Sequence, residues 1–411
     1  MRMAGKRMLI ALAIAVTMVI VAIAPFIALT PRAPNAPTGD VSVEGLERYL
    51  TDLTANETPP ALDVVVMKDG EVKYSKAFGL ADGPTGRPAT VDGVYHFWSV
   101  TKLFTATAIM QLAEDGKIAL DDPVAKYVPE FQTTLGSGAK TEITVRQLLD
   151  HSSGMKNLGP VDLVGWIHRA SDLPVDQTLL VNSRMRSYRS LKNEPGRVSA
   201  YSNAGYIVLG AIIEAASRGK FEDFVRRRIL RPLQMSSTDF VYRDDLQSRA
   251  VTGSHPLFHY FTPLLLFVHH DWFTHWVGNL QRSRMWLVML NTDYTGPTGL
   301  IGTGRDLARF GQAFLNGGEL DGQRILKPES VDMMLNAGFG GNSGPDGDRM
   351  GLGWHWWNNA AIPFKGHGGD GPGFSAQLAI IADLKMVVVV LGSDTLCDRV
   401  GLTNLIAAVF K

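Results

Sequence analysis

The tetrapeptide Ser99-Val100-Thr101-Lys102 has the residue types and the spacing that nucleophilic catalysis needs. A serine hydroxyl is a weak nucleophile at neutral pH and needs a neighbouring group to take its proton. Residues three apart in a helix lie one turn apart on one face, so Lys102 can reach the oxygen of Ser99 if Ser99 opens a helix. A helix start also offers free N–H groups and the positive end of the dipole. The spacing therefore predicts that Ser99 is an acyl-transferring serine.

The chain contains four Ser-x-x-Lys patterns, and the sequence that follows distinguishes the one at Ser99. The patterns at Ser137, Ser153 and Ser217 lie in a glycine-rich loop, directly before a glycine and at a helix end, respectively. Behind Ser99, apolar residues follow a helical period up to Gly116; they are Leu103, Ala106, Ile109, Met110 and Ala113. In isolation such a tetrapeptide is more often a capping serine with a surface lysine. Further motifs must therefore decide between a catalytic serine and a capping serine at Ser99.

The first further motif is Tyr201-Ser202-Asn203, which is the only Tyr-x-Asn sequence in the chain. A phenol accepts a proton when its pKa is lowered, and the charge of an adjacent lysine lowers it. The amide of Asn203 can hold that lysine and a substrate carbonyl. The alternative interpretation is a buried tyrosine followed by a helix-capping asparagine.

The second further motif is His367-Gly368-Gly369-Asp370, which begins a glycine-rich segment. Glycines in a strand allow a substrate backbone to lie against the strand edge. A backbone N–H of that strand can complete an oxyanion hole together with the N–H of Ser99. The alternative interpretation is a glycine-rich turn with a surface histidine.

In this order the three motifs resemble those of the serine β-lactamase and penicillin-binding superfamily. The branch they resemble holds class C β-lactamases, D-alanyl-D-alanine carboxypeptidases and family VIII esterases. Similar segments extend from Leu46 to the C-terminus and include 148–155, 304–308 and 351–354. The resemblance implies that Ser99 is acylated and that Lys102 and Tyr201 move protons in acylation and deacylation. It further implies a substrate-binding set of Asn203, His367, Gly368, Gly369 and Asp370, with the N–H groups of Ser99 and Asp370 as the oxyanion hole.

The third motif departs from the pattern of the lactamases, which commonly have Lys-Thr-Gly where this chain has His367-Gly368-Gly369. Histidine is mostly neutral at pH 7 and is a weaker partner for a substrate carboxylate. We therefore expect an ester or peptide-like amide substrate ahead of a β-lactam. Lys365, on the same strand face, is a candidate for the missing charge. The alternatives are a true β-lactamase, a penicillin-recognising sensor that deacylates slowly, and an inactive scaffold.

The elements expected around these motifs are strands near both chain ends and helices between them. Residues 61–78 form a hairpin about Asp69-Gly70, and residues 364–369, 375–382 and 386–391 form later strands. Helices are expected over 41–53, 205–216, 221–229, 304–315 and 403–410. This order predicts an α+β fold, in which an antiparallel sheet from both chain ends is flanked by helices and a mostly helical second lobe completes the site.

The first 30 residues are expected to be a membrane anchor or a signal peptide. A basic flank precedes the apolar run 8–29, which is long enough for one transmembrane helix. We favour an uncleaved anchor, because the apolar run continues past the small residues that could precede a cleavage site. The basic flank stays in the cytoplasm, so the hydrolase domain, 41–411, is expected in the periplasm or outside the cell. Residues 31–40 are a Pro-rich linker.

Composition limits the partners and cofactors. The formal net charge is zero, which argues against nucleic acid. The only cysteine is Cys397 and no zinc-binding spacing is present, so no disulfide, metal or cofactor is expected. The expected partners are a small-molecule, peptide or ester substrate and a membrane.

The segment 255–286 holds an apolar run and five of the ten histidines. The run is too short to span a bilayer. The segment is either a hydrophobic lid that also meets the membrane surface or a buried insertion in the helical lobe. A metal site on its histidines is less favoured, because prolines interrupt the spacing; those histidines are His255, His259, His269, His270 and His275.

Overall fold

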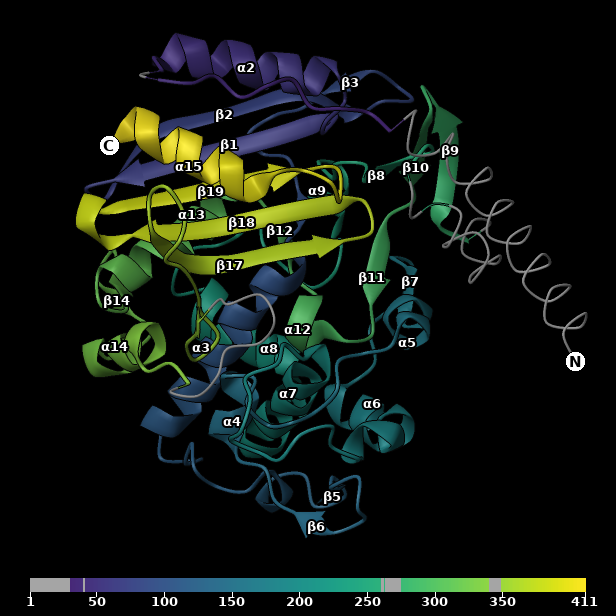
Figure 1. Ribbon diagram of the computed structural model, residues 1–411, viewed down its shortest axis with the longest axis vertical. Helices are drawn as coiled ribbons and strands as arrows, with labels where there is room; N and C mark the ends of the chain where they lie inside the picture. The colour runs from purple at the N-terminus through teal and green to yellow at the C-terminus, as the bar shows by residue number, and fades with distance from the viewer. Residues whose placement is uncertain (1–29, 40, 260–261, 263–274, 340–348) are drawn as a thin grey trace, which may run out of the picture.

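Strands from both ends of the chain meet in one eight-stranded antiparallel sheet, of order β15-β16-β17-β18-β19-β1-β2-β3 (Figure 1). The computed structural model describes residues 30–39, 41–259, 262, 275–339 and 349–411. The hairpin of β1 (Ala61–Lys68) and β2 (Glu71–Asp82) turns at Asp69 and Gly70, which both have positive φ. The last strand, β19 (Met386–Gly392), pairs with β1 along its length. The α+β prediction with a sheet built from both chain ends is therefore confirmed.

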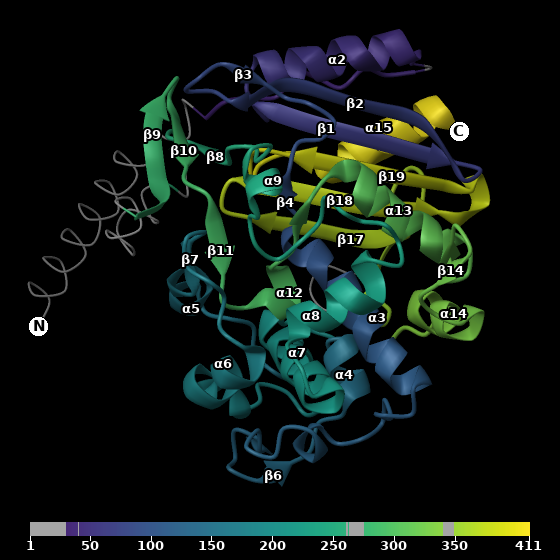
Figure 2. The same cartoon turned by 180° about the vertical axis from the view of Figure 1, so that it is seen from behind.

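The other strands of this sheet, in chain order, are β3 (Arg87–Pro88), β15 (Arg349–Met350), β16 (His355–Trp357), β17 (Phe364–Gly371) and β18 (Phe374–Ile381). β1, β18 and β19 are buried at nearly every position, because both faces of the sheet are covered. On one face, α2 (Val43–Ala55) and α15 (Arg399–Phe410) pack on the sheet (Figure 2). On the other face lies α13 (Gly304–Leu315).

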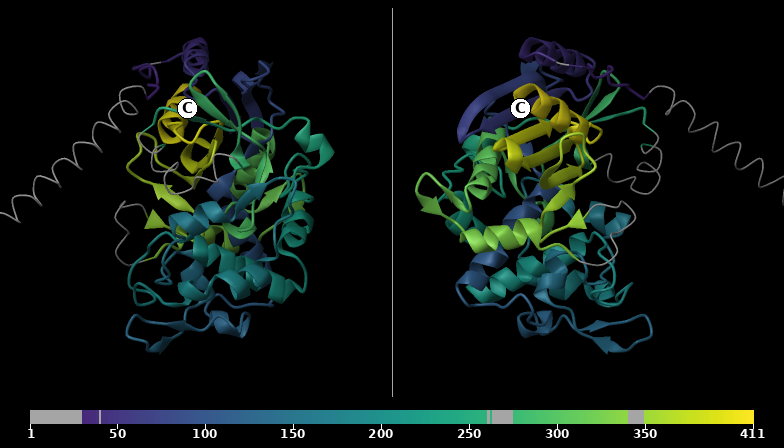
Figure 3. Two further views of the ribbon diagram at one scale, coloured as in Figure 1. Left: turned by 90° about the vertical axis from the view of Figure 1, so that its right-hand side faces the viewer. Right: turned by 60° about the vertical axis from the view of Figure 1, so that its left-hand side comes forward.

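The helical lobe lies beneath the sheet (Figures 1 and 3). Its helices are α3 (Thr101–Glu114), α4 (Val145–Leu149), α5 (Pro160–Gly165), α6 (Gln177–Arg184), α7 (Asn203–Ser217), α8 (Phe221–Val225), α12 (Thr295–Thr298) and α14 (Pro328–Asn336). The short helix α9 (Asp244–Gln247) lies at the level of the sheet instead, where Leu246 packs with Val94 and Ile301 (Figure 2). The sequence predicts that α3 is buried along one apolar face. In the structure the helix is buried on all sides from Thr101 to Leu112, so this prediction covers only part of the buried surface. Its polar side chains are paired; for example, Thr105 donates to the carbonyl of Gly296.

Several two-stranded sheets connect loops outside the eight-stranded sheet. β4 (Tyr95–His96) pairs with β12 (Ile301–Gly302), and β7 (Ile167–Arg169) pairs with β11 (Leu290–Thr292). Two further pairs are β5 (Thr133–Thr134) with β6 (Lys140–Thr141) and β13 (Glu319–Leu320) with β14 (Gln323–Arg324). Just before β12, the N–H of Leu300 donates to Thr101 Oγ1 at 3.1 Å, so this segment lies beside the start of α3.

The flanks of the segment 255–286 form a three-stranded sheet of β8 (Ser254–Pro256), β10 (Arg284–Leu287) and β9 (Val277–Gln281). Residues 260–261 and 263–274 lie outside the described residues, so the lid and the buried insertion both remain predictions. The expected anchor, 1–29, also lies outside them. Within the described ranges, no helix combines the length and the apolarity that a membrane span requires.

Candidate active site

Ser99, the predicted nucleophile, lies in a turn just ahead of the helix that the sequence predicts, and residues 98–100 are called the nucleophile turn below. Residues Trp98–Val100 form a 3₁₀ turn, in which the N–H of Val100 donates to the carbonyl of Phe97 at 3.1 Å, and α3 begins only at Thr101. The expectation that Ser99 opens the α-helix is therefore off by one short turn. The reason is Trp98, whose φ of 45° lies in the left-handed region. Such a conformation costs a bulky residue about 1–3 kcal/mol and is typical of functional sites.

Strand β17 holds this turn in place. The indole of Trp98 stacks on His96 with ring centroids 4.8 Å apart. A Cβ at Gly371 would lie 2.4 Å from that indole, and a Cβ at Gly369 would lie 2.1 Å from the carbonyl oxygen of Phe97. The glycines at this end of β17 thus allow the nucleophile turn to pack closely against the strand. The sequence analysis considered only the room that they leave for a substrate. β16 pairs with β17 only up to Gly366, so the adjoining edge of β17 faces the site without a described strand partner.

Lys102 is fully buried, and its Nζ lies within hydrogen-bond distance of three oxygens. These are Ser99 Oγ at 2.9 Å, Asn203 Oδ1 at 2.7 Å and the carbonyl of Pro297 at 3.1 Å. Burial lowers the pKa of Lys102 well below its usual range. A neutral amine has two N–H groups and one lone pair. The two carbonyl-type oxygens can only accept, so they take both N–H groups and leave the lone pair for the hydroxyl of Ser99.

Tyr201 completes a chain of hydrogen bonds. Its phenol donates to Ser99 Oγ at 2.7 Å, while the hydroxyl of Ser99 can donate to Lys102. Burial is the largest effect on Tyr201 and raises the pKa of its phenol. The prediction that a lysine charge lowers this pKa is wrong, because the burial of the phenol is the larger effect. Tyr201 is therefore the donor in its hydrogen bond with Ser99, and Lys102 lies within reach of the hydroxyl proton of Ser99.

Asn203 serves the lysine and does not cap the helix. The capping residue of α7 is Ser202, whose hydroxyl accepts from the N–H of Gly205 at 3.2 Å. The N–H of Asn203 donates to Asn157 Oδ1 at 2.9 Å, which fixes the start of α7. Its side-chain oxygen accepts from Lys102. The alternative interpretation of Asn203 as a capping residue is therefore excluded.

Three histidines lie around Tyr201, of which His151 and His367 are buried and His355 is partly exposed. The ring of His151 lies 4.8 Å and that of His355 5.9 Å from the Tyr201 ring, and His367 lies 4.2 Å from His355 between centroids. His367 is only 1% exposed, so the surface-histidine interpretation is wrong. Burial lowers the pKa of His355 to about 3 and that of His367 well below its usual range, so both rings are neutral at pH 7.

Hydrogen bonds identify the tautomers of two of these rings. His367 Nδ1 lies 2.6 Å from the carbonyl of Gly368, so this nitrogen carries the proton. His151 Nδ1 accepts from the N–H of Ser202 at 3.1 Å, so its proton is on Nε2. The sequence analysis did not single out His151 or His355. His151 lies within the family-like segment 148–155, and His355 directly follows the family-like segment 351–354. That position was the one feature of the sequence that could have indicated them as site residues.

A pocket of about 300 Å³ opens in front of Ser99. Apolar side chains form much of its wall; they are Trp98, Leu163, Tyr294, Trp357 and Pro372. Tyr201, Asn203, His367, Gly368 and Asp370 also line it, as do His355 and Arg399. Lys102 lies directly behind Ser99, and Gly369 lies against the nucleophile turn. The structure thus brings together all eight residues singled out from the three motifs.

Lys365 does not supply the charge that the third motif lacks. Its ammonium donates to Asn336 Oδ1 at 2.5 Å and lies 5.2 Å from the centre of the Trp356 ring. Trp356 is the partner of Lys365 across the β16–β17 pair. Because that pairing covers this end of β17, Lys365 is kept out of the pocket and the hypothesis of a replacement charge is wrong.

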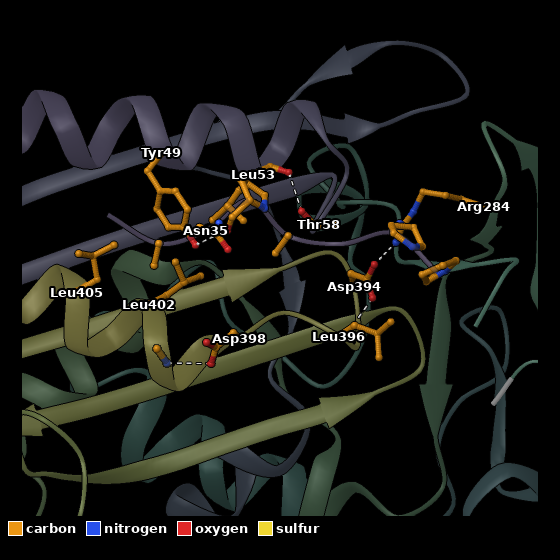
Figure 4. A pocket seen from close by; sticks show the side chains of 16 residues that line it. Asn35, Tyr49, Leu53, Thr58, Arg284, Asp394, Leu396, Asp398, Leu402 and Leu405 are labelled. Carbon is orange, nitrogen blue, oxygen red and sulfur yellow. Dashed lines mark hydrogen bonds and ion pairs between the residues drawn. The ribbon is translucent and has the colours of Figure 1, made fainter. Parts of the chain in front are cut away.

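A second cavity, of about 310 Å³, lies away from Ser99, between the Pro-rich residues 31–36, α2 and α15 (Figure 4). Arg284 and Asp394 form a buried ion pair in its wall, and the phenol of Tyr49 donates to the carbonyl of Pro34 at 3.5 Å. None of the motif residues lines this cavity. Part of the expected linker therefore packs on the domain, but the cavity is not the candidate active site.

The structure describes only some of the histidines of the segment 255–286 that were considered as metal ligands. The rings of His255 and His259 lie 5.3 Å apart between centroids, whereas His269 and His270 lie outside the described residues. In the part of the chain that the structure describes, no group of three or more His, Cys, Asp or Glu side chains is arranged to hold a metal ion.

Comparison with known protein families places this geometry in context. The model of the Beta-lactamase family matches residues 46–405, which is most of the chain. The chain belongs to the beta-lactamase family. Among curated relatives, this beta-lactamase-family protein is 36% identical to Esterase EstB of Burkholderia gladioli over 183 residues, which are 43% of this chain and 46% of EstB. It is 31% identical to Protein flp of Staphylococcus aureus (strain MW2) over 183 residues, 44% of this chain and 35% of flp. The aligned part thus spans less than half of either relative.

Solved structures of the beta-lactamase family share the fold over nearly the whole chain. The octameric penicillin-binding protein homologue from Pyrococcus abyssi superposes with a TM-score of 0.69 at 25% identity, covering 90% of this chain and 78% of that one. The D-amino acid amidase from Ochrobactrum anthropi SV3 gives 0.68 at 20% identity, covering 89% and 97%. A class C beta-lactamase gives 0.68 at 19% identity, covering 89% and 95%. At this identity, the amidase and the lactamase show a shared fold.

Proposed function

We propose that this protein is a serine hydrolase that cleaves ester or amide bonds through an acyl-enzyme on Ser99. The observation that carries the proposal is the hydrogen-bonded chain in which Ser99 Oγ lies 2.9 Å from Lys102 Nζ and 2.7 Å from Tyr201 Oη. The esterase and the amidase among its relatives support ester or amide cleavage. The neutral His367 in the third motif supports these substrates ahead of β-lactams.

In acylation, the lone pair of Lys102 takes the proton of Ser99 as Oγ attacks the substrate carbonyl. The backbone N–H groups of Ser99 and Asp370 stabilise the oxyanion, at the point where β17 lies against the nucleophile turn. The C–O or C–N bond then breaks, and Tyr201 gives its proton to the leaving group. The proton on Lys102 restores Tyr201, since both groups lie at Ser99 Oγ.

In deacylation, water occupies the place of the leaving group. Tyr201 and Lys102 take a proton from this water as it attacks the acyl carbon. The bond from the acyl carbon to Ser99 Oγ breaks and the serine regains its proton. Asn203 holds Lys102 throughout, and its amide nitrogen is available for the substrate carbonyl.

Covalent labelling with a fluorophosphonate probe tests the proposal. The full chain should be labelled, and Ser99→Ala should abolish the labelling. Ser137→Ala is the matched control, because it removes the serine of another Ser-x-x-Lys pattern, in an exposed loop. A folded protein without labelling at Ser99 would refute the proposal. A panel of esters, D-amino acid amides and a cephalosporin then defines the reaction, with esters or amides expected to be cleaved fastest.

We further propose that residues 1–30 anchor the hydrolase domain to a membrane, with residues 41–411 outside the cytoplasm. The basic flank and the apolar run 8–29 support this location. Fractionation should find the full chain with membranes, and a chain lacking 1–30 in the soluble fraction. Equal distribution of both chains would refute the anchor.

A further inference from the structure

The wall of the active-site pocket carries one pair of opposite charges. Arg399 is the first residue of α15 and Asp370 lies near the end of β17. Arg399 Nε lies 3.1 and 3.2 Å from the two oxygens of Asp370, and its Nη2 lies 2.5 Å from Asp370 Oδ2. This is the two-pronged geometry in which a guanidinium recognises a carboxylate. Among the described residues that line the pocket, these two carry the only fixed charges.

The guanidinium of Arg399 is fixed from the other side as well. Its Nη1 donates to Gln377 Oε1 at 3.2 Å, and a Cβ at Gly368 would lie 2.5 Å from its Cζ. The side chain of Arg399 is 21% exposed and that of Asp370 is 40% exposed. A substrate therefore meets the carboxylate of Asp370 more readily than the guanidinium behind it.

The other basic side chains of the described site cannot bind a substrate carboxylate. Lys102 is buried and shares its hydrogen bonds among three oxygens. His367 and His355 are kept neutral by burial, and Lys365 points to Asn336 outside the pocket. The rest of the wall is largely aromatic or aliphatic. A substrate carboxylate would consequently lose its water without gaining a cationic partner.

We propose that Asp370 is a specificity residue that occupies Arg399 in place of a substrate carboxylate, so that the pocket selects uncharged, apolar acyl groups. The selectivity rests on the proposed serine hydrolase function and names its substrate class. Removing the charge of Asp370 frees the guanidinium of Arg399, which then attracts anionic acyl groups. Removing the charge of Arg399 has the opposite effect, because it leaves the carboxylate of Asp370 without its partner.

The experiment compares two esters with five-carbon acyl chains, 4-nitrophenyl pentanoate and 4-nitrophenyl hemiglutarate, on the full chain. The wild type should prefer pentanoate. Asp370→Asn should raise the ratio of kcat/KM for hemiglutarate to that for pentanoate about tenfold or more, mainly through KM, because a charged hydrogen bond is gained. Added salt should reduce this gain. Rates with Ser99→Ala are subtracted as background.

Two further variants at the pair give opposite expectations. Arg399→Gln should lower the ratio, and Asp370→Asn combined with Arg399→Gln should show no gain over the wild type. Asp121→Asn is the matched control, because it removes the carboxylate of an exposed pair with Arg146, which lies at 2.7 Å and does not line the pocket. Asp370→Ser is a second way to free Arg399.

The amount of active enzyme is set for each variant by fluorophosphonate labelling of Ser99. An unchanged ratio in labelled Asp370→Asn or Asp370→Ser would overturn the specificity proposal. So would a wild type that cleaves hemiglutarate as fast as pentanoate, whatever the variants do. The hydrolase proposal fails in a different way, since the wild type would then neither take the label nor cleave either ester.

Discussion

At the scale of single residues, burial acts on the two ionisable groups that contact Ser99. Lys102 is fully buried and Tyr201 is partly buried, and loss of water moves their pKa values in opposite directions, down for the amine and up for the phenol. Together with Ser99 they form a chain of hydrogen bonds that runs from the phenol of Tyr201 through the hydroxyl of Ser99 to the amine of Lys102. The lowered pKa of Lys102 favours the uncharged amine, which is the form that can accept a proton from Ser99.

Lys102→Arg should be nearly inactive although it keeps the positive charge. Arginine cannot give up its proton and so cannot act as the base. The loss in kcat should be on the order of 10²–10⁴, the usual contribution of a general base. In the wild type, kcat should fall as the pH is lowered, because protonation of Lys102 removes the base. A full pH–rate profile of both proteins checks this; substantial activity in Lys102→Arg would contradict it.

Asp63 of β1 provides a test of stability at the same scale. It is completely buried beside Gly304, and burial raises its pKa to about 8. Between pH 4 and 8 the folded protein keeps the proton while the unfolded chain releases it. The free energy of unfolding therefore falls as the pH rises through this window, by up to about 1.4 kcal/mol per pH unit.

Asp63→Asn should remove this pH dependence, because an amide does not titrate. Urea unfolding at pH 5 and pH 8 should show the wild type losing stability relative to the variant at the higher pH. Asp69→Asn is the control, since Asp69 lies in the exposed turn of the same hairpin. If wild type and Asp63→Asn have the same pH dependence, Asp63 is not protonated in the folded state.

At the scale of elements, the nucleophile turn depends on the close approach of β17. Gly371→Ala would place a Cβ 2.4 Å from the indole of Trp98 and push the turn away from its strained conformation. We expect a loss of about 1–3 kcal/mol of stability, typical of overpacking, and a large fall in Ser99 labelling. Gly136→Ala is the control, because its Cβ would meet no atom within 4 Å. Normal labelling of Gly371→Ala would contradict this account.

The same elements show what the sequence could predict. The hairpin at Asp69-Gly70, the helix over 304–315 and the pairing of strands from both chain ends follow from turn chemistry and periodicity. The positive φ of Trp98 and the low pKa of Lys102 do not, because both depend on distant residues packed around them. The Asp370–Arg399 pair joins a strand to a helix and was likewise hidden from local patterns.

At the scale of the whole molecule, both faces of the sheet are needed to hold the site. α15 covers one face through Leu402, Ile406 and Ala407, and its first residue, Arg399, reaches the pocket. Ile406→Ala should cost about 2–5 kcal/mol, as is usual for a fully buried isoleucine. Urea unfolding measures the cost, with Leu396→Ala, in an exposed position, as the control. Equal stability of the two variants would contradict the role of α15.

The pairing of β1 with β19 also governs when activity can appear during synthesis. β18 and β17 are joined to β1 only through β19, so the strands behind the nucleophile turn are not connected to β1 until residues 386–392 have been made. Contacts between such distant segments form late in folding, because the intervening chain must first be ordered. A chain that stops short of β19 therefore lacks the strand pairing that joins β17, which lies against the turn of Ser99, to β1.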